Sequence, residues 1–271
     1  MSLTSFIDEK DVRERFNAEF LKPVLIKNQM LLAPPLTQNS RIVGSAFDYL
    51  IRFHLKRLNP QAVELPWIAE NAWYILDSRG LDELCEQASQ IVTQAKERYR
   101  EFLTTQTLTD ELLASTLLLA KLDGFYRALR MDENLLQVNE EDVRDLRALI
   151  SAVDFSLFQT SGTVILNPQF KSSSLVRGAD ADLILDDLLV DIKTVRELDL
   201  KRRDFNQLVG YYVLSRIDAL KGVPLTYDIK RLGIYFSRHA YLFTFNVEGV
   251  IDEGKFPEFL EWFQLRAGKS F

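Results

Sequence analysis

Two short apolar runs separated by only two acidic residues place the strongest constraint on how this chain can fold. Residues 183–185 (Leu-Ile-Leu) and 188–190 (Leu-Leu-Val) flank an Asp-Asp pair. Apolar runs of this length, joined by two turn-forming residues, are typical of antiparallel strands connected by a tight turn. The sequence therefore predicts a β-hairpin over residues 183–190.

The register of this hairpin decides which charged side chains meet beyond its apolar part. With a two-residue turn, Asp182 lies opposite Asp191, and Asp180 lies opposite Lys193. Directly opposed residues project from the same face, with Cβ atoms about 4.5–5.5 Å apart. Lys193 shares a face with Asp191, because side chains two residues apart on a strand point the same way. Two carboxylates and an ammonium are thus expected on one surface.

Such an arrangement favours a divalent cation. Neighbouring carboxylates repel each other unless a positive charge offsets them. Mg²⁺ prefers oxygen ligands and commonly takes one or two protein carboxylates together with water and a substrate phosphate. A lysine beside it can orient an attacking water and stabilise charge on a phosphate oxygen. The pattern therefore indicates phosphodiester hydrolysis with Mg²⁺ or Mn²⁺ as cofactor.

An acidic residue two positions before a lysine is weak evidence by itself, because the sequence holds five such triplets. Only Asp191 and Lys193 stand at the end of an apolar strand with an acidic residue on the preceding strand. The alternative for this triplet is a solvated sheet face that carries a salt bridge. The other triplets are interpreted as solvated charges: Asp8/Lys10, Asp199/Lys201, Asp228/Lys230 and Glu253/Lys255.

The remaining sequence divides into a helical part and a part rich in strands. Residues 66–153 have an almost entirely helical pattern, and short β-rich runs follow after about residue 160. The expected helices are 44–58, 81–102, 109–129, 139–153, 199–220 and one beginning at Pro257; the expected strands are 163–166, 183–185, 188–190, 231–236 and 241–247. This order predicts an α/β fold, with a mixed central sheet flanked by helices and a large helical insertion.

Four segments resemble motifs of the PD-(D/E)xK nucleases, and most closely the branch that includes the RecB nuclease domain. Residues 177–185 and 189–194 are similar to the central motif, with alanine before the aspartate where the family's name-giving motif has proline. Residues 207–211 (Gln-Leu-Val-Gly-Tyr) resemble its Gln-Leu-x-x-Tyr helix motif. Residues 44–48 (Gly-Ser-Ala-Phe-Asp) resemble its Gly-x-x-x-His motif, with aspartate in place of histidine.

The resemblance implies a fold and a domain layout. The fold would be restriction-endonuclease-like, a mixed central sheet with helices on both sides. The nuclease core would cover residues 40–58 and 160–271. Residues 60–155 would form a helical insertion or subdomain within a single domain of residues 1–271, and this insertion could contact a partner protein.

The resemblance also implies which residues bind the metal. Asp182 and Asp191 would be ligands, with the backbone carbonyl of Ile192 as a third. Asp48 would bind a second metal ion or a metal-bound water, since aspartate is also a hard oxygen ligand. The choice between Asp180 and Asp182 depends on the hairpin register. It favours Asp182, which faces Asp191 and precedes Leu-Ile as in the family.

The catalytic and DNA-binding roles follow from the same motifs and from charge. Lys193 would serve the attacking water, Gln207 would hold Lys193 or the substrate phosphate, and Tyr211 would lie one helical turn on. Cations at a helix N-terminus are mildly unfavourable, which suggests phosphate contacts for the basic residues near the start of this helix. These candidates are Arg196, Lys201, Arg202 and Arg203. DNA is the expected substrate; RNA, strand polarity and exonuclease against endonuclease action stay open.

Composition narrows the alternatives. The formal net charge of −6 argues against general adhesion to nucleic acid, although basic residues can gather on one face. The single Cys85 excludes an internal disulfide, and no Gly-rich phosphate loop is present. The longest apolar stretch, residues 117–120, is far shorter than the roughly 20 residues of a membrane span. We expect a cytoplasmic protein without membrane contact; the rival to a nuclease is an inactive nuclease-fold module for nucleic-acid binding or protein assembly.

Overall fold

The computed structural model of the protein describes residues 2–128, 135–221 and 227–269. Within these ranges, six strands form one sheet in the order β1-β2-β3-β4-β5-β6. β1 pairs parallel with β2 and β4 with β5, while the other neighbours are antiparallel. The predicted α/β class with a mixed sheet is confirmed. The strands are β1 (Val63–Glu64), β2 (Val164–Leu166), β3 (Leu183–Leu185), β4 (Leu188–Lys193), β5 (Arg231–Phe236) and β6 (Tyr241–Asn246).

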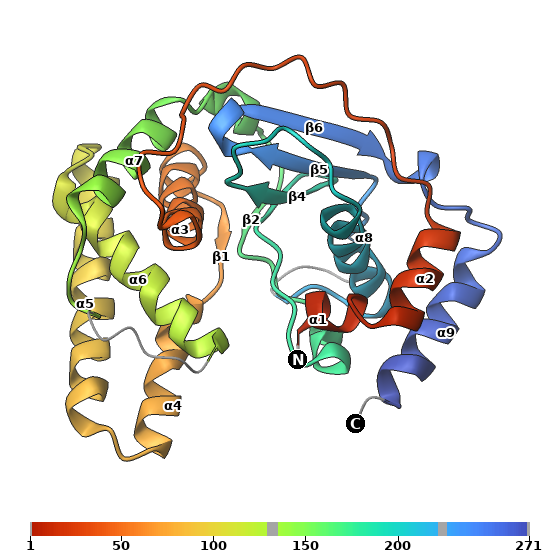
Figure 1. Cartoon of the computed structure of the whole chain (residues 1–271), viewed down its shortest axis with the longest axis horizontal. Coiled ribbons are helices and arrows are strands. Elements are labelled where there is room, and N and C mark those ends of the chain that lie inside the picture. Colours follow the sequence, from red (N-terminus) through yellow and green to blue (C-terminus); the bar gives the residue numbers. More distant parts are fainter. Residues whose placement is uncertain (1, 129–134, 222–226, 270–271) are drawn as a thin grey trace.

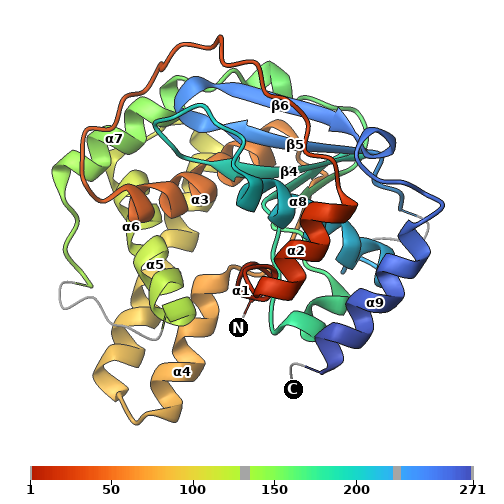
Figure 2. The ribbon, with the colours of Figure 1, turned by 45° about the vertical axis from the view of Figure 1, so that its right-hand side comes forward.

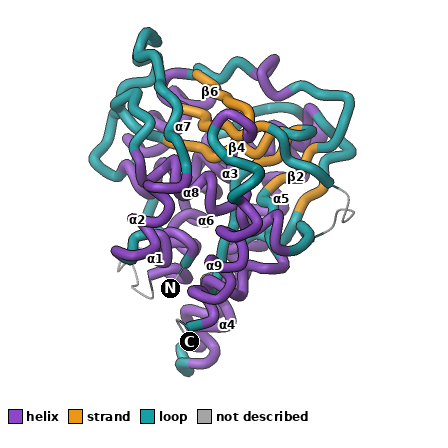
Figure 3. The backbone as a smooth tube through the Cα atoms, turned by 90° about the vertical axis from the view of Figure 1, so that its right-hand side faces the viewer, coloured by secondary structure: helices purple, strands orange, loops and turns teal. Residues whose placement is uncertain are grey.

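Helices cover both faces of the sheet. The face that carries Leu183 and Val190 packs against α3 to α7, and the face that carries Ile184 and Leu189 packs against α1, α2, α8 and α9. Figure 1 shows α4, α5 and α6 as one arm and α1, α2 and α9 as the other, both below the strands, and Figure 3 shows the strands gathered toward one end. The helices are α1 (Leu3–Ile7), α2 (Lys10–Glu19), α3 (Ser40–Leu58), α4 (Ala72–Ser78), α5 (Asp82–Thr105), α6 (Asp110–Ala128), α7 (Glu140–Ser151), α8 (Arg202–Ile217) and α9 (Phe256–Gly268). Among the residues described, no helix combines the length and apolar character that a membrane span requires.

The predicted hairpin is present with the predicted register. β3 pairs with β4 through the residue pairs expected from a two-residue turn: Leu183–Val190, Ile184–Leu189 and Leu185–Leu188. The first turn residue, Asp186, has a left-handed φ of 52°, which aspartate tolerates better than most residues. Its carboxylate accepts a hydrogen bond from Thr160 Oγ1 at 2.5 Å. The turn is therefore held from outside the hairpin.

The chain before β3 follows β2 rather than β4. The backbone N–H of Asn167 donates to the carbonyl of Asp182 at 3.0 Å, and Asp180 forms an antiparallel bridge with Gln169. The prediction that Asp180 lies opposite Lys193 is therefore wrong. The physical reason is that β2 continues to supply backbone partners, so the chain stays with it after its pairing with β4 has ended.

Three elements lie where the sequence analysis predicts none. α1 and α2, in residues 1–43, both contact α8. β1 lies within residues 60–155, the expected helical insertion, but it pairs with β2 and so belongs to the sheet. The helical part of the chain therefore begins after β1.

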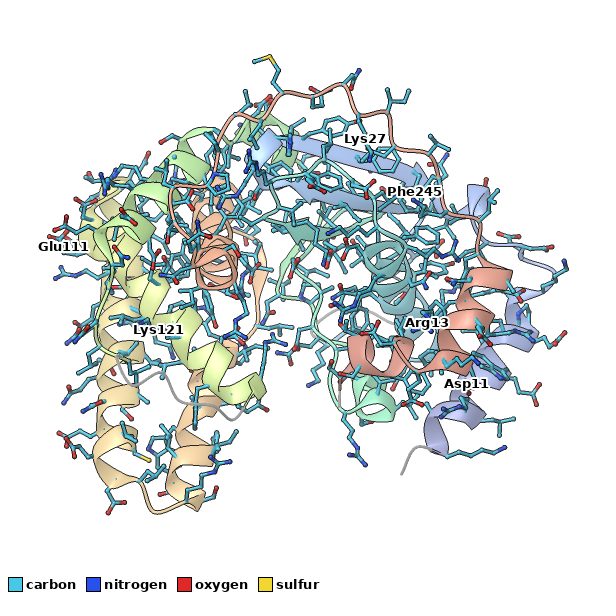
Figure 4. All side chains as sticks on the ribbon, in the orientation of Figure 1. Asp11, Arg13, Lys27, Glu111, Lys121 and Phe245 are labelled. Carbon is cyan, nitrogen blue, oxygen red and sulfur yellow. The ribbon has the colours of Figure 1, made fainter. Side chains whose placement is uncertain are left out.

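A buried ion pair joins the helical part to the far edge of the sheet. Arg238, between β5 and β6, donates to both carboxylate oxygens of Asp145 on α7 at 2.8 and 2.9 Å. The two side chains are 1% and 0% exposed. Arg238 Nη1 also donates to the carbonyl of Ala33 at 3.0 Å, in the extended segment that crosses above β6 and carries Lys27 (Figures 1 and 4). One guanidinium thus connects three segments.

Loss of this ion pair should destabilise the fold strongly. We expect Asp145→Ala to lower the free energy of unfolding by about 3–5 kcal/mol, because it leaves the buried Arg238 charge without a partner. Asp110→Ala removes an exposed ion pair of 2.6 Å with Arg147 and should cost about 0–1 kcal/mol. Urea unfolding followed by circular dichroism measures both. Equal losses in the two variants would contradict the role given to Arg238.

His54 is a core residue of α3. Its ring centroid lies 4.6 Å from that of Phe102 and 5.0 Å from that of Phe155. The side chain is 8% exposed, and neither ring nitrogen has a hydrogen-bond partner among the described residues. Burial, assisted by the positive charge of Arg57, lowers the pKa of His54 to about 4. His54 is therefore neutral in the folded protein at pH 7.

This burial predicts a stability that depends on pH. The pKa of His54 is lower in the folded state than in the unfolded state. The stability that depends on neutral His54 is therefore fully present above about pH 6.5 and is lost as the pH drops toward 4. Lowering the pH from about 7.5 to about 5 should lower the free energy of unfolding by about 2 kcal/mol through this residue. In urea unfolding at these two pH values, His54→Leu should lose that part of the pH dependence. An unchanged dependence would show that His54 is not the group responsible.

Candidate functional site

Asp191 and Lys193 project from one face at the C-terminal end of β4. Asp191 is 2% exposed, and its Oδ2 lies 2.8 Å from Lys193 Nζ. Burial alone would lower the pKa of Lys193, but the negative charges of Asp191 and Asp204 outweigh it and the pKa is raised. Lys193 is therefore an ammonium ion at neutral pH.

One face of α8 completes the surroundings of Lys193. Lys193 Nζ donates to Gln207 Oε1 at 3.0 Å, and Gln207 Nε2 donates to the Tyr211 hydroxyl at 2.8 Å. The contacts expected for Gln207 and Tyr211 are thus present. Asp204 also places Oδ1 3.8 Å from Lys193 Nζ, and the sequence analysis missed it. Its position three residues before Gln207, on the same helical face, was the available signal.

Asp182 lies just before β3 and close to Asp191. Its Oδ2 accepts a hydrogen bond from the backbone N–H of Ile192 at 2.6 Å. Loss of hydration raises the pKa of Asp182 well above its usual range, and the negative charges of Asp48 and Asp191 raise it further. Within the described part of the chain, Asp182 forms no ion pair with a basic side chain. The structure therefore places Asp182, and not Asp180, beside Asp191.

Asp48 approaches the same region from α3. Arg52 Nη2 donates to Asp48 Oδ2 at 2.6 Å, while Asp48 Oδ1 is buried and has no hydrogen-bond partner among the residues described. Burial raises the pKa of Asp48, and the positive charge of Arg52 opposes this. α3 comes close to the end of β4 at Gly44, where an added Cβ would lie 3.5 Å from Thr194 Cβ. α3 thus brings a further carboxylate toward Asp182.

The helical part supplies charged groups that the sequence analysis did not assign to the site. On α6, Arg127 Nε donates to Asp123 Oδ1, and Arg127 Nη2 lies 3.8 Å from Asp180 Oδ2. Asp123 is 7% exposed. The oppositely charged pair four residues apart on this helix was the available signal. Asp180 therefore contacts the helical part instead of Lys193.

The four basic residues predicted to contact DNA have different surroundings. Arg202 donates to the carbonyls of Phe16 and Phe20, each at 2.8 Å, and so ties the start of α8 to the end of α2. Arg203 forms an exposed ion pair of 2.7 Å with Asp8. The other two, Arg196 and Lys201, are exposed. The packing of Arg202 accounts for its position near a helix N-terminus without a phosphate contact.

The acidic network has an excess of negative charge that a cation would offset. Among the residues described, there is no cluster of three or more His, Cys, Asp or Glu side chains placed to hold a metal ion. A metal ion here would rely on Asp182 and Asp191, supplemented by the Ile192 carbonyl, water and substrate phosphate, and Mg²⁺ accepts such a set. The buried, unpaired Asp48 Oδ1 fits a hard cation as well. The network joins Asp48, Asp123, Asp180, Asp182, Asp191 and Asp204 to Arg52, Arg127 and Lys193.

Groups of opposite charge meet in this site. An ammonium, two adjacent carboxylates and an amide side chain meet where β4 ends beside α8. Comparison of the chain with protein-family models, with curated proteins and with solved structures found no match.

Proposed function

We propose that the chain is a metal-dependent nuclease of the PD-(D/E)xK type, in the RecB-like branch, which hydrolyses phosphodiester bonds of DNA. The observation that carries the proposal is the environment of Asp182. This carboxylate lies near the negative charges of Asp48 and Asp191, and a backbone N–H is its hydrogen-bond donor. The charge of Lys193 compensates Asp182 only in part, and burial of a partly compensated charge destabilises a fold, so a site of this kind favours the binding of a cation.

The chain's own residues would divide the work of hydrolysis. Asp182, Asp191 and the Ile192 carbonyl would hold Mg²⁺ or Mn²⁺, which supplies activation of a water and neutralisation of phosphate charge. Lys193, as an ammonium directed by Gln207, donates hydrogen bonds to the attacking water or to a non-bridging phosphate oxygen. The water oxygen would bond to phosphorus while the bond from phosphorus to the leaving oxygen breaks. The attacking water would lose its proton to solvent, and the leaving oxygen would take one up from solvent, which gives a phosphate monoester and a hydroxyl end.

The direct test is cleavage of end-labelled linear DNA, single-stranded and duplex, and of RNA, with Mg²⁺ or Mn²⁺ and with EDTA. We expect metal-dependent cleavage. Lys193→Ala and Asp191→Ala should each lower the rate by about 10²–10³, because the first removes a hydrogen-bond donor to the reacting groups and the second a ligand of the metal ion. Gln207→Ala should cost about 10–100-fold, since it only positions Lys193.

The sequence offers a matched control for this test. Glu253 and Lys255 form the same acidic-x-Lys triplet on an exposed segment far from the site in the chain. Glu253→Ala and Lys255→Ala should leave the cleavage rate unchanged. Full activity in Lys193→Ala and Asp191→Ala would remove the assignment. Absence of cleavage in the unaltered chain with every substrate and metal would favour the inactive binding module instead.

Binding of metal should be visible as stabilisation. At Mn²⁺ concentrations about one hundred times the Kd, we expect the melting temperature to rise by about 5–10 °C, because the ion binds only the folded state. Asp182→Asn should abolish this rise. In EDTA the same variant should melt about 2–4 °C higher than the unaltered chain, because it removes a negative charge that the fold holds at a cost.

An exposed aspartate provides the comparison for that variant. Asp228 forms a surface ion pair of 3.0 Å with Arg216. Asp228→Asn should keep the full Mn²⁺ shift and should not melt higher in EDTA. If Mn²⁺ stabilised Asp182→Asn as much as the unaltered chain, Asp182 could not be a ligand of the ion.

A further inference from the structure

A groove of about 770 Å³ runs between the two arms of the molecule. α4 and α6 form one wall, and α1 with the 3-10 turn η3 (Lys171–Val176) forms the other. Figures 1 and 2 show these elements facing each other below the sheet. One wall comes from residues 68–127 and the other from segments on either side of them in the sequence, so the groove exists only in the folded chain.

Positive charge is concentrated in this groove. Arg127, Arg177 and Lys221 line it together with one acidic residue, Asp180; Arg127 pairs with Asp180 and Asp123, so the surplus of positive charge comes from Arg177 and Lys221. The chain as a whole has a net charge of −6, so a groove with this surplus of cations differs from the average surface. Lys221 Nζ donates to Gln169 Oε1 at 3.2 Å, on the same wall, which holds its ammonium at the groove. Such a surface attracts an anionic chain.

Two tyrosines from the helical wall line the same groove. Tyr74 on α4 is 66% exposed, and Tyr126 on α6 is 36% exposed. The neighbouring Trp73 meets Tyr74 edge to face, with ring centroids 5.3 Å apart, so at least one face of the tyrosine ring lies outside this contact. Aromatic faces beside cations are the combination that binds unpaired nucleotides, because bases stack while phosphates meet the positive charges.

The groove leads to the site described above. Asp180 lines the groove, and Asp182 follows two residues later along the chain. Arg127 lines the groove as well, and its positive charge acts on the carboxyl of Asp48. Asp182 is not part of the groove lining, so a strand bound there would pass Asp180 to reach it.

We propose that this groove binds an unpaired strand of nucleic acid and guides it to the site. The inference rests on the proposed nuclease function and adds the form of its substrate. The volume is that of sites that enclose a single compact ligand, which suits a few unpaired nucleotides rather than a duplex. The tyrosines stack on bases, and Arg177 and Lys221 contact phosphates.

Binding can be measured apart from cleavage. The probe is a fluorescein-labelled oligothymidylate of about 12 nucleotides, titrated with the full chain in EDTA and followed by anisotropy. Tyr74→Ala and Tyr126→Ala should each weaken binding about 10-fold, through the loss of stacking on a base. Tyr74→Phe keeps the ring and should bind as the unaltered chain does. Equal binding by Tyr74→Ala and Tyr74→Phe would overturn the stacking role.

Salt dependence tests the role of the cations. The double variant Arg177→Gln/Lys221→Gln should bind more weakly, and the slope of log affinity against log salt should become shallower by about 1.4. Arg98→Gln/Lys255→Gln removes the same charge at exposed positions outside the groove lining and should leave the slope unchanged. The same slope in both double variants would place the phosphate contacts elsewhere and overturn the proposal.

Further measurements separate the groove from the catalytic site. The annealed duplex should compete poorly for binding; equal competition by duplex would overturn the preference for an unpaired strand. If the chain cleaves DNA but its KM for single strands is unchanged in the tyrosine variants, the groove proposal fails and the nuclease stands. If binding depends on the groove and no metal supports cleavage, the groove stands and the nuclease fails.

Discussion

Burial of negative charge at the end of β4 is the constraint on which the rest of the site depends. Asp191 is almost fully buried, and the backbone N–H of Ile192 holds the Asp182 carboxylate close by. Charges removed from water must be offset by nearby charges or hydrogen bonds, or the fold loses several kcal/mol. Lys193 offsets Asp191, and Gln207 keeps Lys193 in place. The charge balance of the site therefore depends on the position of α8 against the sheet.

Charge also ties the helical part of the chain to the sheet. Arg127 on α6 contacts Asp180 just before β3, and Asp145 on α7 pairs with Arg238 beyond β5. These contacts join elements that lie far apart in sequence, and they hold α6 and α7 relative to the strands. Both walls of the groove are thereby set when the chain folds. A strand that binds there meets a preformed surface, which reduces the ordering cost of association.

The sequence predicts those parts of the site that depend on local rules. Turn length determines hairpin register, and strand periodicity then places Lys193 beside Asp191. Gln207 follows from the motif resemblance and from helical spacing. Asp180 was misplaced because the same pairing rule was extended past the last paired residues, where β2 competes with β4 for the backbone. Arg127 was missed because helical periodicity identifies a buried face but not which distant strand its charged residues meet.

Two other aspartates in the chain are paired with arginine, which sets Asp182 apart from them. Asp145 is neutralised by Arg238, and Asp48 by Arg52, so this fold can supply a guanidinium where a carboxylate needs one. Within the described residues, Asp182 has no direct ion pair: the backbone N–H of Ile192 and the more distant charge of Lys193 favour its ionised form, but burial and the negative charges of Asp48 and Asp191 outweigh them. A purely structural role would favour an asparagine or an apolar residue there. The carboxylate at this position is explained if a cation from solution completes the site, so that metal binding and stability become coupled.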